Sequence, residues 1–178
     1  ITDDTNLPRI SYENFSYQDA LGSELITNGD FENGNTGWSN SNTNGFSVSN
    51  GKLNLLNVAY TKSTIQTNVT TVGKIYKVTY EVSDYIQGSF RIVLGGTVLP
   101  TITANGVYTD YVTATNATYV IIQAFSGQPT TLSIDNVSVK EYLGQEVVPN
   151  SGCGSWLFEP QSTNLVTYSE DFSQWLPY

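Results

Sequence analysis

The sequence predicts an all-β protein built as one antiparallel sandwich, and three observations lead to this fold class. Short runs of β-branched and aromatic residues alternate with polar ones, which is the period of a strand with one buried face. Gly and Asn interrupt these runs at short intervals, as the turns between strands require. Charged residues make up only 13% of the 178 residues, so hydroxyl and amide groups dominate the polar surface.

The strands can be placed in chain order. The pair Asn50-Gly51 predicts a two-residue type I′ hairpin between strands at 46–49 and 53–56. Residues 75–82 alternate most regularly, and their apolar side chains are expected to face the core: Tyr76, Val78, Tyr80 and Val82. The other strands are expected at 64–69, 89–94, 97–102, 108–113 and 118–125.

Two strands carry additional information. Residues 118–125 are nearly continuous in apolar character, which favours a central position in a sheet. The last strand, 132–142, changes the phase of its apolar residues at Asp135-Asn136, and this predicts a β-bulge. Because a bulge re-aims side chains, Asp135 is expected to point away from the direction of its neighbours.

Charge and composition exclude several function classes. A net charge of -9 argues against nucleic-acid binding, which needs a basic surface. The single cysteine, Cys153, cannot form an internal disulfide, and no apolar run reaches the roughly 18 residues of a membrane span. The chain has no histidine and no nucleophile elbow, and its close carboxylate pairs are equally explained as surface or metal-site groups. We therefore expect no catalytic residues and a non-enzymatic protein.

The two ends of the central segment carry a family resemblance. The stretch Asn28-Gly-Asp-Phe-Glu-Asn-Gly-Asn-Thr-Gly-Trp38 and the stretch Ile134-Asp-Asn-Val-Ser-Val139 resemble the start and end of jelly-roll carbohydrate-binding modules of cellulases and xylanases. The resemblance implies a jelly roll whose first and last strands lie side by side.

The same resemblance implies a structural calcium ion between the terminal strands. By motif position Glu32 and Asp135 match best, while Asp30 occupies a variable position, so the candidate metal ligands are Asp30, Glu32 and Asp135. Backbone carbonyls near Asn28 and Lys52 are further candidate donors. The alternative is that Asp30 closes a turn and Asp135 only accepts backbone N–H groups.

A glycan-binding face is predicted on the strand at 118–125. Alternate residues of a strand share one face, and the candidate sugar-binding side chains on the face opposite Val120 and Ile122 are Tyr119, Gln123 and Phe125. Aromatic rings and planar amides are the groups on which sugars bind. The alternative is that both faces of this strand are covered, with Trp38 packed in the core beneath the first turn.

The flanks carry a second resemblance. Leu7-Pro-Arg-Ile-Ser-Tyr12 and the stretch from Trp156 to Trp175 resemble segments of bacteriophage virion proteins, especially fibres and tail appendages. The expected organisation is an N-terminal arm at 1–23, a β-sandwich at 24–142, and at 143–178 a C-terminal connector that begins a further β module.

The resemblance implies a virion structural protein, head or tail fibre or decoration, that displays the sandwich for host-surface glycan adhesion or as a spacer. It also implies a homotrimer in contact with other virion proteins. The expected assembly residues are Tyr12, Phe15, Tyr17, Trp156, Leu157 and Phe158. The alternative is a carbohydrate-binding module of a secreted polysaccharide-degrading enzyme.

Overall fold

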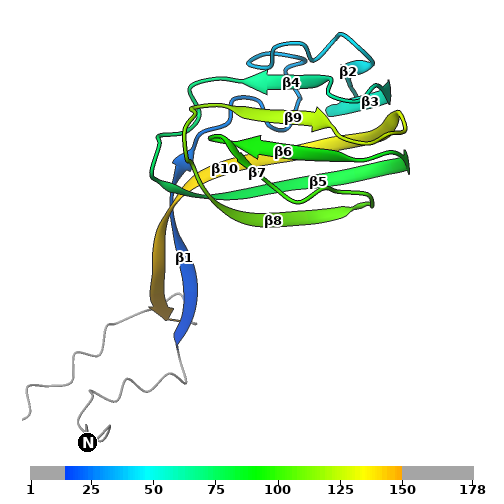
Figure 1. The fold of residues 1–178 in the computed structure, drawn as a ribbon. Helices are drawn as coiled ribbons and strands as arrows, with labels where there is room; N and C mark the ends of the chain where they lie inside the picture. The colour runs from blue at the N-terminus through cyan, green and yellow to red at the C-terminus, as the bar shows by residue number, and fades with distance from the viewer. Residues whose placement is uncertain (1–14, 150–178) are drawn as a thin grey trace, which may run out of the picture. The chain divides into compact units, whose positions relative to one another are not determined.

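The computed structural model describes the backbone of residues 15–149 and the side chains of residues 18–145, and residues 19–146 form one compact unit. Within residues 15–149 there is no helix, so none that could cross a membrane. The strands are β1 (Phe15–Glu24), β2 (Phe46–Ser49), β3 (Lys52–Val58), β4 (Ser63–Gln66), β5 (Ile75–Gln87), β6 (Phe90–Leu94), β7 (Thr97–Val98), β8 (Gly106–Thr113), β9 (Val120–Ala124) and β10 (Thr130–Pro149) (Figure 1).

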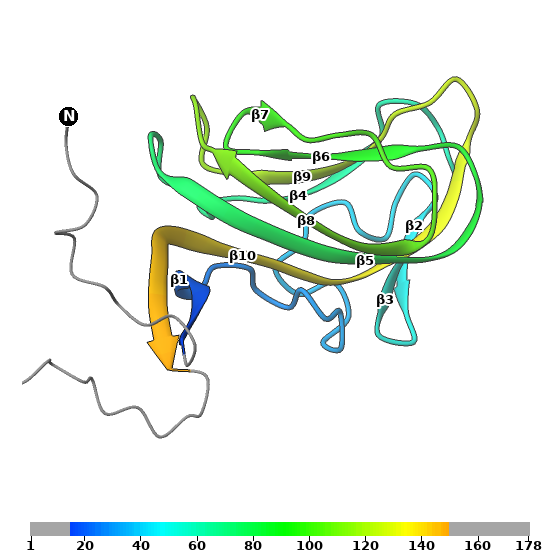
Figure 2. The ribbon, with the colours of Figure 1, turned by 90° about the horizontal axis from the view of Figure 1, so that it is seen from below.

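The strands form two antiparallel sheets, which confirms the predicted β-sandwich. The larger sheet has the order β2-β3-β10-β5-β8, and β1 also pairs with β10. The smaller sheet has the order β4-β9-β6-β7, so the apolar strand β9 lies inside its sheet as predicted. Figure 2 shows the two layers, with β4, β6, β7 and β9 on one side and β5, β8 and β10 on the other.

The core lies between these layers and follows the predicted alternation. Tyr76, Val78, Tyr80 and Val82 of β5 are all buried, as the strand period requires. From the smaller sheet, the inward side chains of β6 and β9 meet them: Phe90, Ile92, Leu94, Val120, Ile122 and Ala124. These side chains belong to one continuous hydrophobic cluster.

The predicted hairpin and bulge are both present. Ser49 pairs with Lys52, and the two turn residues, Asn50 and Gly51, have φ angles of 55° and 66°, as a type I′ turn requires. The register of β10 against β5 shifts between Asp135 and Ser138, with Asn136 at a φ of 51°. Local turn chemistry and the phase of apolar residues therefore predicted these two features correctly.

Several element boundaries differ from the prediction. The strand expected at 97–102 is a strand only at Thr97–Val98, because Pro100 has no N–H to donate to a ladder. The strand expected at 64–69 ends at Gln66, while β5 continues past Val82 to Gln87. β1 begins at Phe15, so residues assigned to the N-terminal arm contribute a strand that pairs with β10.

Asp19 attaches β1 to strands β5 and β8 of the larger sheet. Its Oδ2 lies 2.6 Å from Lys77 Nζ of β5 and accepts a 2.6 Å hydrogen bond from the Tyr111 hydroxyl of β8. The hydrogen bond from Lys77, followed by that from Tyr111, lowers the pKa of Asp19 below its ordinary value of 3.8. The charged form of Asp19 is therefore the one that holds the strand.

We expect the attachment of β1 to weaken in acid. A carboxyl whose pKa is lower in the folded state stabilises the fold fully above its unfolded pKa, and this contribution is lost as the pH falls through the folded value. The protection of the amides of residues 19–24 against hydrogen exchange should fall below about pH 3.8, and Asp19→Asn should lower this protection already at pH 7. Asp84→Asn, which removes the Lys52 ion pair elsewhere on the sheet, is the matched control. Equal protection in Asp19→Asn and wild type would contradict this role.

Candidate functional site

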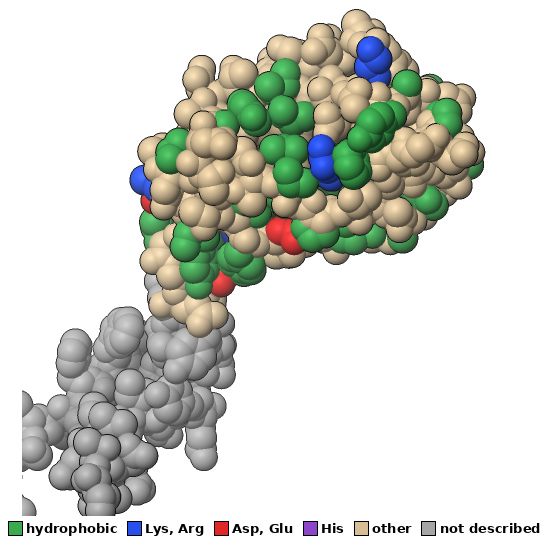
Figure 3. Space-filling model, in the orientation of Figure 1, with side chains coloured by type: hydrophobic (Ala, Val, Ile, Leu, Met, Phe, Trp, Pro, Cys, Tyr) green, Lys and Arg blue, Asp and Glu red, His purple; other side chains and the backbone are tan. Residues whose placement is uncertain are grey.

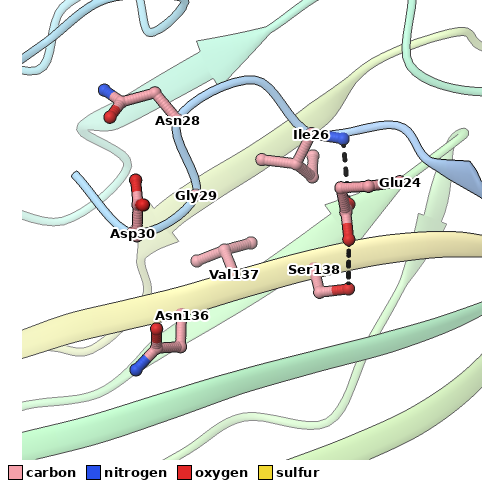
Figure 4. Close-up of a pocket in the computed structure, with 8 residues that line it drawn as sticks. All are labelled: Glu24, Ile26, Asn28, Gly29, Asp30, Asn136, Val137 and Ser138. Atoms are coloured by element: carbon pink, nitrogen blue, oxygen red, sulfur yellow. Dashed lines mark hydrogen bonds between the residues drawn. The ribbon is translucent and has the colours of Figure 1, made fainter. Parts of the chain in front are cut away.

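An open pocket lies where the first and last parts of the sandwich meet. It has a volume of about 390 Å³ and is lined by residues from the end of β1, the following turn and the bulge of β10: Glu24, Ile26, Asn28, Gly29, Asp30, Asn136, Val137 and Ser138 (Figure 4). Two backbone hydrogen bonds join its sides, from Leu25 N to Val139 O at 3.0 Å and from Val137 N to Gly29 O at 2.9 Å. The predicted pairing of the two motif stretches is therefore confirmed.

Glu24 links the two sides through its carboxylate. Oε1 accepts hydrogen bonds from the backbone N–H groups of Leu25, Ile26 and Val139, at 3.1, 3.0 and 2.9 Å. Oε2 accepts a 2.5 Å bond from the Ser138 hydroxyl (Figure 4). Four donors occupy most of the acceptor capacity of a carboxylate. Glu24 therefore serves to join the chain segments, and sequence reasoning did not single it out.

The three predicted metal ligands are not brought into one group. Asp30 lines the pocket, Asp135 accepts a 2.6 Å bond from Asn136 N, and Glu32 lies against Gly51 at the tip of the β2–β3 hairpin. Among the described residues, no three Asp, Glu, Cys or His side chains form a group that could hold a metal ion. Calcium binding stays a prediction, and it would rest on fewer carboxylates together with backbone carbonyls.

Trp38 is part of the core, as the alternative reading expected. Only 4% of its surface is exposed, and its ring centroid lies 5.5 Å from that of the buried Phe31. Its indole Nε1–H donates to Asn28 O at 3.1 Å, so the polar atom of the ring is also satisfied. Trp38 is therefore not available to a ligand.

The predicted face of β9 exists and belongs to a broader surface. Tyr119, Ile121, Gln123 and Phe125 are half-buried and alternate with buried residues. In the antiparallel register Ile121 lies opposite Ile65 and Val93, and Gln123 lies opposite Ser63 and Arg91. We call this surface the smaller-sheet face, formed by the outward side chains of β4, β6 and β9 with Tyr60, Tyr119 and Phe125.

Arg91 is the centre of the polar end of this face. Its Nε and Nη2 both donate to Gln123 Oε1, at 3.0 and 2.9 Å. Its guanidinium carbon lies 3.6 Å from the centroid of the Phe125 ring, and that ring lies 5.4 Å from the ring of Tyr60. Gln123 Nε2 donates in turn to Thr61 O at 3.4 Å. These contacts connect four side chains into one group, which we call the Arg91 cluster: Arg91, Gln123, Phe125 and Tyr60.

Of the three predicted glycan-binding residues, the Arg91 cluster unites two. Gln123 and Phe125 belong to it, whereas Tyr119 lies two same-face positions earlier along the strand. Arg91 and Tyr60 were not chosen as site residues. The alternation of β6, with Phe90 and Ile92 inward, would have placed Arg91 on the outer face, but its pairing with Gln123 depends on strand order.

No family model matches the chain, and no curated protein matches it. Among solved structures, the fold is similar to a mutant of CBM29-2, a family 29 carbohydrate-binding module, with a TM-score of 0.41 and 12% identity over 71% of this chain and 85% of that chain. It is also similar to the apo structure of BiXyn10A CBM1, with a TM-score of 0.41 and 16% identity over 70% of this chain and 88% of that chain. At this level of similarity neither structure bears on the site.

Proposed function

We propose that this chain is a non-enzymatic carbohydrate-binding β-sandwich whose ligand lies on the smaller-sheet face. The observation that carries the proposal is the Arg91 cluster. An aromatic ring offers an apolar surface to the C–H face of a sugar, and fixed amide and guanidinium groups offer directed hydrogen bonds to its hydroxyls. The cluster supplies both kinds of group side by side on an open sheet face.

The side chains of the cluster have different parts in this proposal. Arg91 covers one side of the Phe125 ring and Tyr60 packs against that ring, so Phe125 serves to position the other two. Tyr60 is 53% exposed and is therefore the ring available for stacking on a sugar. Tyr119 is a second aromatic position on the same face for a longer ligand.

Tyr60→Ala should weaken glycan binding by about tenfold, the loss expected when an aromatic contact of roughly 1–1.5 kcal/mol is removed. The measurement is binding of the full chain to a glycan array, followed by calorimetric titration of the glycans that bind. Tyr60→Phe should retain most of the affinity, because the ring remains.

Tyr111→Ala is the matched control, because Tyr111 is 52% exposed on the larger sheet. Equal affinity losses in Tyr60→Ala and Tyr111→Ala would contradict the proposed location. An array without any bound glycan would contradict the proposed function and would favour a spacer. Repeating the array with a chelator tests calcium separately, since a structural ion would be needed for binding only if it holds this face in place.

The setting that we propose is a phage virion, in which this sandwich attaches to host-surface glycans as part of a fibre or appendage. Support comes from the flanking sequence stretches. Of the predicted assembly residues, Tyr12, Trp156, Leu157 and Phe158 lie outside the described residues. For Phe15 and Tyr17 only the backbone, in β1, is described. The homotrimer and its contacts with other virion proteins stay predictions.

A second setting is a secreted polysaccharide-degrading enzyme, in which the same face would hold the catalytic domain near its substrate. The glycan-binding proposal is common to both settings. A catalytic domain in the full-length protein would favour the enzyme setting, whereas recovery of the chain in purified particles would favour the virion.

A further inference from the structure

Acidic side chains are absent from one layer of the sandwich. The strands β4, β6, β7 and β9 contain no Asp or Glu, and neither do the stretches 33–80, 85–109 and 111–134 that include them. The acidic residues whose side chains are described lie instead in the larger sheet and in the turn after β1: Asp19, Glu24, Asp30, Glu32, Glu81, Asp84, Asp110, Asp135 and Glu141. The carboxylates of the described residues are thus distributed very unevenly between the two layers.

Two basic residues lie in or beside the strands of the acid-free layer, whereas the other described Lys residues lie in or next to the strands of the larger sheet. Arg91 is the single Lys or Arg in its four strands, and Lys62 immediately precedes β4. Lys62 is exposed and lies beside the end of β9, where its carbonyl accepts a 3.0 Å bond from Ala124 N. Figure 3 shows Lys and Arg side chains among hydrophobic ones over the upper part of this view, whereas Asp and Glu appear only lower down, where other Lys or Arg side chains lie beside them.

Arg91 is held in place without a carboxylate. The ion pairs of the described residues all use lysines, with Lys52, Lys74 and Lys77 as the cations. Arg91 instead donates two of its five N–H groups to the neutral Gln123 and stacks on Phe125. Its planar fork is therefore already oriented, which reduces the entropy lost when it binds a carboxylate or sulfate with two parallel hydrogen bonds.

We infer that the smaller-sheet face binds an acidic saccharide, with the negative group on Arg91 and a sugar ring on Tyr60. This inference rests on the proposed function and adds the substrate class. An anion here approaches the guanidinium of Arg91, and the four strands of this layer carry no carboxylate. Repulsion from the acidic larger sheet is weakened by screening, because the Debye length is about 8 Å at physiological ionic strength.

The test uses the full chain on an array that carries carboxylated, sulfated and neutral glycans. Binding is expected to concentrate on the carboxylated or sulfated members. Each bound glycan is then titrated beside its neutral counterpart, the methyl ester or the desulfated form, and the neutral form should bind about 10–100-fold more weakly, the range for loss of a charge-assisted pair. The array arms also identify which anionic group the site takes.

Variants assign the effect to Arg91. Arg91→Gln should weaken binding of the acidic glycan by the same 10–100-fold, and Lys140→Gln, which removes an equal charge from β10, should leave it unchanged. Phe125→Leu keeps the cation but removes its support, so a smaller loss is expected. Arg91→Lys keeps the positive charge but lacks the planar guanidinium. Thermal melting confirms that each variant is folded.

The outcomes separate the inference from the proposed function. Neutral glycans that bind equally to wild type and Arg91→Gln, yet are lost in Tyr60→Ala, would overturn the acidic class and leave the carbohydrate site standing. Acidic glycans that bind Arg91→Gln as tightly as wild type would overturn the role of Arg91. Absence of binding to every glycan would overturn both.

Discussion

Trp38→Ala is expected to lower the free energy of unfolding by about 3–5 kcal/mol, the usual cost of removing a large buried aromatic side chain. Trp38 is 4% exposed, and its ring packs on Phe31, which is 1% exposed. The indole N–H also satisfies Asn28 O. The substitution therefore creates a cavity and removes a hydrogen bond in the same turn.

The turn around Trp38 adds to this effect. The side chain of Asn28 also stabilises this turn. Asn28 Nδ2 donates to Gly34 O at 2.8 Å, and Asn28 Oδ1 accepts from Asn33 N at 3.0 Å. Asn28 has a φ of 53°, so the turn is built on a left-handed residue that its neighbours must stabilise. Loss of the indole is expected to disturb this network as well as the core.

Urea unfolding of the full chain measures the effect. Trp38→Phe is the matched variant, since it keeps an aromatic ring and loses the N–H donor, and it should cost about 1–2 kcal/mol. Glycan affinity of folded Trp38→Phe should equal that of wild type, because Trp38 is buried in the core and does not belong to the Arg91 cluster. A cost below about 1 kcal/mol for Trp38→Ala would mean that the ring is not a core residue.

Local features of the fold could be predicted from the sequence. The Asn50-Gly51 turn, the inward side chains of β5 and the bulge at Asp135-Asn136 each depend on residues close together in the chain. Strand period and turn chemistry act over such short distances. The same reasoning placed Gln123 and Phe125 on one face, and the structure has them there.

Features that depend on strand order could not be predicted in this way. Alternation assigns Arg91 to an outer face, but only the pairing of β6 with β9 brings it to Gln123. Glu24 reaches Ser138 across 114 positions of sequence, which no local pattern encodes. The proposed metal ligands were grouped by motif position, yet Asp30 and Asp135 serve separate local contacts. The contact partners of these side chains are set by which strands lie next to each other, and the alternation of residues along a single strand does not reveal that order.

The backbone contact between the two motif stretches depends on a glycine. Gly29 O accepts from Val137 N at 2.9 Å, and a Cβ on Gly29 would overlap the carbonyl oxygen of Val137. The φ angle of Gly29 is not positive, so its backbone conformation does not require a glycine. What requires a glycine here is the close approach of the two backbones. The atoms that a methyl group would meet are backbone atoms of the bulged strand β10, which cannot rotate away as a side chain would.

Gly29→Ala is accordingly expected to cost about 3 kcal/mol, at the upper end for overpacking, because relief requires β1 and the turn after it to separate from β10. Urea unfolding gives the cost, and faster amide exchange at Val137 and Val139 would locate it. Gly127→Ala is the matched control, because a Cβ there meets no atom within 4 Å. If Gly29→Ala matched Gly127→Ala in stability and exchange, the close approach would not be what joins the ends of the sandwich. A loss confined to Gly29→Ala would instead mean that the close backbone approach at this glycine helps to join the ends of the sandwich.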